Sequence, residues 1–446
     1  MIDLAPILAH GVGGRSDLPV PLWMALYGGG GAVVVSFVAL GALWLTPRLD
    51  GGNGGRPLPL PLRRVIDAPA TRAVLRGIGF TAWLATVLVA AFGPASSANN
   101  PVPTWLYVWL WVGLVPASLL LGPVWRALNP LRAITALLAR LSGDPDDSAV
   151  RPLPAGLGYW PAAAGLTVFV WLELVFPRPD APLTVLGFVL AYSFAQVVAA
   201  SVYGQAWYAR GDAFEVYSSL IARLAPFGRR PDGKLAVRNP LVGLAAVRTE
   251  PSMVAAIVVL LGSTAFDGLT RTAVWSDLTR GAGQVAYLAL GTAGLAGGIA
   301  LVALLYAGAM HLASRLTDGG PAGGELVGRF AHSLIPIAVG YAIAHYFSLL
   351  VFQGQAGYIL ASDPFGRGHD LFGTASWAIS YTAVSVTAIA LVQVAAIVAG
   401  HVVGVIAAHD RAVGLFTGED KTRSQYPLLA VMVAYTVGGI ALLVGA

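Results

Sequence analysis

Long apolar runs recur along the whole chain and are separated by shorter segments rich in polar residues, Gly and Pro. Most of these runs are long enough for a helix to cross a hydrocarbon core about 30 Å thick. They predict ten transmembrane helices, at about residues 21–46, 74–92, 104–122, 160–176, 183–203, 251–269, 284–311, 327–352, 376–408 and 426–445. We therefore predict an all-α fold, a polytopic integral membrane helical bundle that forms a single transmembrane domain over residues 1–446 and contacts the lipid bilayer.

The basic residues are distributed unevenly among the segments between these spans. With the N-terminus outside, 22 of the 27 Lys and Arg residues fall in or beside cytoplasmic segments, and 5, Arg271 among them, fall in external ones. Because Lys and Arg favour the cytoplasmic side, both termini are predicted outside the cell membrane. The longest cytoplasmic loop, 204–250, contains an amphipathic segment at 214–224 that we expect to lie as a helix in the membrane interface.

The amino-acid composition restricts the kinds of site and partner that the protein can have. Hydrophobic residues make up 57% of the chain and charged residues 11%, whereas soluble proteins have about 25% charged residues. The absence of Cys excludes thiolate metal sites, iron–sulfur clusters and disulfides. The net charge of +5 reflects Arg in the cytoplasmic segments, so it gives no reason to expect a nucleic-acid partner. Any metal site must use His, carboxylate, Tyr or Met ligands.

Ionisable residues inside the spans are the first candidates for function, because their burial in lipid is costly. Asp267 and His345 both lie one to two turns from the outer ends of their spans, and we expect their side chains within about 8 Å of each other. Glu173 and the external His10 are further candidates. Imidazole and carboxylate suit a divalent metal that activates water, with His345, Asp267 and His10 as ligands and Asp267, His345 and Glu173 as catalytic groups. Alternatively, the two carboxylates reach water at the interface and His345 only bonds to a neighbouring helix.

His332 and His401 form a second candidate site, in the inner half of the membrane. Both lie about 8–10 Å from the inner ends of antiparallel spans, so they can meet at one level. Two facing imidazoles could hold a b-type haem or a metal ion. The alternative is that each histidine makes an ordinary hydrogen bond between helices.

Two cytoplasmic segments share the phrase Asn-Pro-Leu, at 129–131 and 239–241. Asn followed by Pro favours a helix start, with Asn as the N-cap. Ten spans can also divide into five plus five with inverted topology, as in many secondary transporters. A secondary transporter is therefore an alternative function.

A set of distinctive phrases lies at residues 9–19, 211–218, 262–268, 330–348, 400–404 and 424–427. These phrases resemble an actinobacterial group of membrane proteins labelled fenitrothion hydrolase-like. The resemblance implies metal-assisted attack of water on an organophosphate triester, and it identifies no catalytic residue. Our leading hypothesis is therefore a membrane-embedded, metal-dependent hydrolase of a small-molecule substrate. The alternatives are a secondary transporter and a haem- or copper-binding redox subunit.

Overall fold

The computed structural model describes residues 21–49, 54–143, 149–247, 250–318 and 320–444. Within these residues the chain is mainly helical, and nine helices are long and apolar enough to cross a membrane. They are α2 (Leu22–Leu43), α4 (Pro69–Phe92), η2 with α5 (Thr104–Leu121), α9 (Pro182–Tyr203), α13 (Pro251–Thr270), α15 (Gln284–Arg315), α16 to η5 (Gly323–Ser362), α18 (Val386–Leu415) and α19 with α20 (Asp420–Leu442). The predicted all-α, multi-pass architecture is confirmed at this level.

The predicted fourth span, at 160–176, corresponds to the shorter apolar helix α8 (Trp160–Leu174). Its 15 residues extend about 22 Å, less than the roughly 30 Å of a hydrocarbon core. Within the described residues, the structure therefore has nine long apolar helices and one shorter apolar helix, α8. A total of ten spans stays a prediction.

The predicted start of the ninth span, at residue 376, is wrong. Residues 376–385 form no helix, and α18 begins at Val386, where the Ser385 hydroxyl accepts a hydrogen bond from the backbone of Ala388. The backbone of Ser380 instead exchanges hydrogen bonds with the Gln355 side chain. Apolar composition alone suggested a longer helix, but the serine cap and the Gln355 contact set the boundary.

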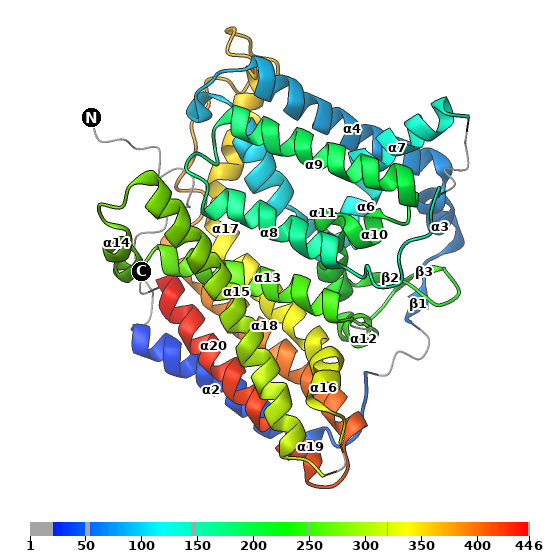
Figure 1. Ribbon diagram of the computed structural model, residues 1–446, viewed down its shortest axis with the longest axis vertical. Helices are drawn as coiled ribbons and strands as arrows, with labels where there is room; N and C mark the ends of the chain where they lie inside the picture. Colours follow the sequence, from blue (N-terminus) through cyan, green and yellow to red (C-terminus); the bar gives the residue numbers. More distant parts are fainter. Residues whose placement is uncertain (1–20, 50–53, 144–148, 248–249, 319, 445–446) are drawn as a thin grey trace. The chain divides into compact units, whose positions relative to one another are not determined.

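The described part of the chain divides into two compact units. Unit 1 comprises described residues of 55–237 and 348–383. Its helix α4 packs against α6 (Val124–Leu128), α7 (Pro130–Leu141) and α9, and α11 (Ala213–Ile221) packs against α5, α6 and α8 (Figure 1). A small antiparallel sheet has the strand order β1 (Arg56–Pro57), β3 (Leu235–Val237) and β2 (Phe227–Arg229).

Unit 2 comprises described residues of 21–54, 238–347 and 384–444. Helix α2 lies beside α18 and α20 (Tyr426–Val444), and α13 lies beside α15 (Figure 1). A Cβ atom at Gly262 of α13 would lie only 2.5 Å from the Cα atom of Ile299 of α15. A residue without a side chain thus lets these two backbones approach closely, and this approach fixes the position of the last turns of α13.

The two Asn-Pro phrases have the predicted local structure. The side chain of Asn129 caps α7 and that of Asn239 caps α12 (Pro240–Ala245), each by accepting a hydrogen bond from the backbone two residues later. Asn129 is buried, however, and Asn239 is exposed. The two units also interleave along the chain and do not correspond to its first and second halves. The five-plus-five repeat therefore stays a prediction.

Candidate functional site

Asp267 and His345 meet inside unit 2, as the sequence predicts. Asp267 lies in the last turn of α13 and His345 lies in α17 (Ile335–Ile359). Oδ2 of Asp267 and Nε2 of His345 are 2.5 Å apart, and both side chains are buried. A buried carboxylate needs such a partner because burial penalises its charge.

Arg271 is a third member of this group that the sequence analysis assigned only to an external loop. It follows α13 directly, and its Nη2 atom lies 3.0 Å from Nε2 of His345. Its Nε atom lies 3.7 Å from Oδ1 of Asp267, four residues earlier. This i, i+4 spacing of opposite charges was the available sequence signal. The guanidinium balances the carboxylate, so the group is neutral when the imidazole is neutral.

Nε2 of His345 has two polar neighbours that require opposite tautomers. An ionised Asp267 can only accept a hydrogen bond from Nε2–H, whereas Nη2 of Arg271 can only donate to a lone pair on Nε2. In the part of the chain that the structure describes, no hydrogen bond to Nδ1 is present. Nδ1 is therefore a proton acceptor in the first tautomer and an N–H donor in the second.

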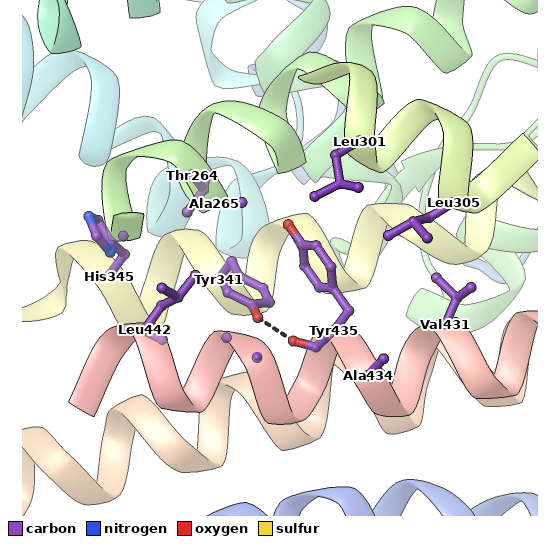
Figure 2. Close-up of a pocket in the computed structure, with 14 residues that line it drawn as sticks. Thr264, Ala265, Leu301, Leu305, Tyr341, His345, Val431, Ala434, Tyr435 and Leu442 are labelled. Carbon is purple, nitrogen blue, oxygen red and sulfur yellow. Dashed lines mark hydrogen bonds between the residues drawn. The ribbon is translucent and has the colours of Figure 1, made fainter. Parts of the chain in front are cut away.

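His345 lines a cavity of about 220 Å³ between α13, α15, α17 and α20. Figure 2 shows His345 at one end of this cavity and Leu305 and Val431 at the other. Three lining residues carry hydroxyl groups, and each hydroxyl donates to a backbone carbonyl. They are Thr264, Tyr341 and Tyr435, which donate to Leu260, Tyr435 and Leu261 respectively. The described wall is therefore apolar apart from the imidazole.

The predicted metal site stays a prediction, and the described residues alone give it no support. They contain no group of three His, Asp or Glu side chains that could hold an ion, whereas a catalytic zinc takes three protein ligands at about 2.0–2.2 Å. The facing atoms of Asp267 and His345 bond to each other, and the charge beside them is already supplied by Arg271. His10, the third predicted ligand, lies outside the described residues.

Glu173 belongs to α8 in unit 1, where it lies close to Tyr107 and Tyr217. Asp267 and His345 belong to unit 2. The predicted association of Glu173 with that pair stays a prediction.

The two inner histidines lie at different heights along α18, although only His401 belongs to that helix. His332 lies beside the backbone of Ala407, whereas the ring of His401 contacts the rings of Tyr341 and Tyr435. His401 and Ala407 are six residues apart in α18, which corresponds to about 9 Å along the helix axis. Within the described residues, no hydrogen bond or ring contact joins His332 to His401. The haem and metal hypotheses for this pair gain no support from these contacts.

Unit 1 contains a buried polar network that the sequence analysis missed. Asn129 donates to Asp212 at 2.7 Å, and two nitrogens of Arg132 donate to the two oxygens of Glu215 at 2.7 and 2.8 Å. Tyr192 donates to Asp212 at 2.9 Å. Burial, and then the charge of Glu215, raise the pKa of Asp212.

This network surrounds the segment for which an interfacial helix is predicted. The Asp212 side chain caps α11, and Glu215 lies in the first turn of the same helix. Both carboxylates are buried, so α11 is covered by protein on its polar side as well as its apolar side. Asp followed three residues later by Glu resembles a capping box and was the available signal. Whether the rest of loop 204–250 lies at the membrane surface stays a prediction.

Comparisons with protein-family models, with curated proteins and with solved structures find no match to this chain. A functional proposal therefore depends on the residues, on their geometry and on the resemblance of the sequence phrases described above.

Proposed function

We propose that the chain is a cell-membrane protein with ten spans and both termini outside, in which α8 is a short fourth span. Nine long apolar helices and α8 support this number. The excess of Lys and Arg in the alternate loops supports the orientation.

Labelling of introduced cysteines tests the topology, because the natural chain has no Cys. Cysteines that replace Ser96 and Ser276 should react with a membrane-impermeant maleimide added to intact cells, and a cysteine that replaces Ser142 should react only after lysis. All three serines are exposed, so failure to react reports the side of the membrane rather than burial. The reverse labelling pattern would overturn the orientation.

We propose further that His345 and Asp267 form the acid–base centre of a hydrolase. The observation that carries this proposal is a cavity-lining imidazole whose Nε2 lies 2.5 Å from a buried carboxylate and whose Nδ1 has no hydrogen bond within the described residues. The same imidazole–carboxylate pairing orients the general base in serine hydrolases. The resemblance described above favours an ester, and specifically a phosphotriester, as the substrate.

In this mechanism, His345 carries its proton on Nε2, and Nδ1 accepts a proton from water as the water oxygen attacks the ester centre. The resulting imidazolium is stabilised by the Asp267 carboxylate, which also lies 3.7 Å from Nε of Arg271. As the ester bond breaks, the imidazolium returns its proton to the departing oxygen. Water and ester are thus converted to acid and alcohol, and no proton is gained or lost by the enzyme.

Release of p-nitrophenol from diethyl p-nitrophenyl phosphate and from a p-nitrophenyl carboxylate tests this function on purified protein in nanodiscs. His345→Gln should reduce turnover by about 100-fold or more, and Asp267→Asn should act in the same direction. His311→Gln is the matched control, because His311 is an exposed histidine of α15 outside the cavity lining. No turnover by the natural protein, or equal turnover by the two histidine variants, contradicts the proposal.

Proton-coupled transport is a second candidate, favoured by irregular backbone inside the long helices. A 3₁₀ turn, Ala331–Leu334, precedes α17, and η2 (Thr104–Val112) is a π-helix. Such interruptions occur at the binding sites of transporters. Uptake into proteoliposomes that requires a pH gradient and Asp267, without hydrolysis, would favour this function.

A further inference from the structure

Two segments of unit 1 together carry a surplus of positive charge close to that of the whole chain. Residues 54–67 and 227–237 contain six basic and two acidic side chains, a surplus of four charges, and the net charge of the chain is +5. We call the six basic residues the basic platform: Arg56, Arg63, Arg64, Arg229, Arg230 and Lys234. Positive charge is therefore concentrated in a small part of this unit.

The two segments are joined in the folded chain. Strand β1 of the first segment pairs with β3 of the second. Arg230 donates a hydrogen bond to the carbonyl oxygen of Gly55 at 2.9 Å. Arg229 forms an ion pair with Asp67, the last residue of helix α3 (Leu60–Asp67). The small sheet and α3 therefore hold the basic side chains in one region of unit 1.

The small sheet has one basic, partly apolar face. Arg56 of β1 lies opposite Val237 of β3. Arg229 of β2 lies opposite Leu235, which is two residues before Val237. Residues directly opposite each other, or two apart on one strand, point to the same face of a sheet. Arg56 and Arg229 therefore share a face with the exposed Val237, whereas the buried Ala236 points to the other face.

Helix α3 has an apolar face that the described chain leaves exposed. Leu62, Val65 and Ile66 are 46%, 62% and 40% exposed, and α3 has no buried residue. At about 100° per residue these three side chains lie within one arc of roughly 100°, with Arg63 and Arg64 on its two sides. An apolar arc flanked by arginines is typical of a helix that lies in a membrane interface.

Helix α3 also lies at the end of an apolar helix. One residue, Ala68, separates it from α4, which is long and apolar enough to cross a membrane. Val74 and Ile78 in the first turns of α4 are exposed, so apolar surface continues from α3 into α4. Arg56 and Arg64 are exposed, and within the described residues neither forms an ion pair. Two cations are therefore available to a ligand at this boundary.

We propose that the basic platform binds the phosphate head groups of acidic phospholipids in the leaflet at this end of α4. Guanidinium groups form strong, often bidentate, hydrogen bonds with phosphate. Clusters of basic residues on an amphipathic helix beside a span attract acidic lipids. A polyanion dissolved in water would balance the charges but would leave the apolar face of α3 exposed. The lipid covers both, and this inference does not depend on hydrolysis or transport.

Quenching by brominated lipids measures which lipid lies beside α3. The natural chain has no Cys, so Val65→Cys provides one attachment site for a bimane fluorophore. The labelled protein is reconstituted in vesicles of equal amounts of phosphatidylglycerol and phosphatidylcholine, with bromine on the acyl chains of one lipid or of the other. The ratio of the two quenching efficiencies gives the lipid composition at α3. We expect phosphatidylglycerol to be enriched about fivefold there, and the enrichment to fall in about 1 M NaCl.

Removal of exposed charges tests the assignment to the platform. Arg56→Gln together with Arg64→Gln should reduce the enrichment to about twofold or less, because two cations are lost beside the fluorophore. Arg178→Gln together with Arg367→Gln is the matched control. It removes the same charge from exposed residues of unit 1 that belong to predicted external segments, and it should preserve the enrichment.

Equal quenching by the two lipids, at low and at high salt, would overturn the preference for acidic head groups without the use of any charge variant. A fluorophore that neither brominated lipid quenches would show that α3 faces water, and would replace the bilayer by an acidic partner in solution. The same loss of enrichment in both double variants would show that net charge alone is responsible, and would overturn the assignment to these residues.

Discussion

Replacement of Arg132 by Met is expected to destabilise the folded protein by about 3–5 kcal/mol. The guanidinium donates two hydrogen bonds to Glu215 and two more to Gln205, and both Arg132 and Glu215 are buried. Its removal leaves the Glu215 carboxylate buried beside Asp212 and without the cation that lies between α7 and α11.

The large effect arises from the uncompensated charge rather than from the loss of an ion pair as such. The double variant Arg132→Met with Glu215→Met should therefore recover most of the lost stability. Thermal unfolding of purified protein in one detergent measures both changes. Arg126→Met is the matched control, because its side chain is 65% exposed and only approaches Glu215, at 3.9 Å. It should cost about 1 kcal/mol or less. An Arg132→Met protein that unfolds like the natural one would show that this network contributes little to stability.

Replacement of Gly79 by Ala is expected to destabilise unit 1 by about 3 kcal/mol, at the upper end of typical overpacking costs. A Cβ atom at Gly79 of α4 would lie 1.6 Å from the carbonyl oxygen of Leu128, the last residue of α6. Backbone cannot yield as a flexible side chain can, so α4 and α6 must separate. Asn129 directly follows the displaced end of α6. The hydrogen bond from Asn129 to Asp212 should therefore weaken as well.

Gly77 provides a control in the same helix, two residues earlier. No atom lies within 4 Å of a Cβ atom placed there, so Gly77→Ala should stabilise the protein by up to about 1 kcal/mol through helix propensity. The difference between the two variants in unfolding temperature isolates the contact with Leu128 from the general effect of alanine. Equal unfolding temperatures would rule out the close approach of α4 to α6.

The sequence by itself determined the class of fold and most helix positions. The length of an apolar run is a property of one segment, and a helix satisfies its own backbone hydrogen bonds, so each long run predicts its helix without knowledge of its neighbours. The pairing of Asp267 with His345 was also predictable, because a carboxylate and an imidazole at the same depth each need a polar partner. The caps at Asn129 and Asn239 are local in the same sense.

Only the tertiary structure decided which faces of the helices meet. It brought Arg271 to the Asp267–His345 pair, placed His332 and His401 at different levels of α18, and enclosed the Asp212 and Glu215 carboxylates within unit 1. The hydrophobic pattern does not determine these contacts, because an apolar helix has no polar face that fixes its rotation about its own axis. Rotation and spacing depend instead on close contacts between residues distant in sequence, such as Gly262 with Ile299 and Gly79 with Leu128.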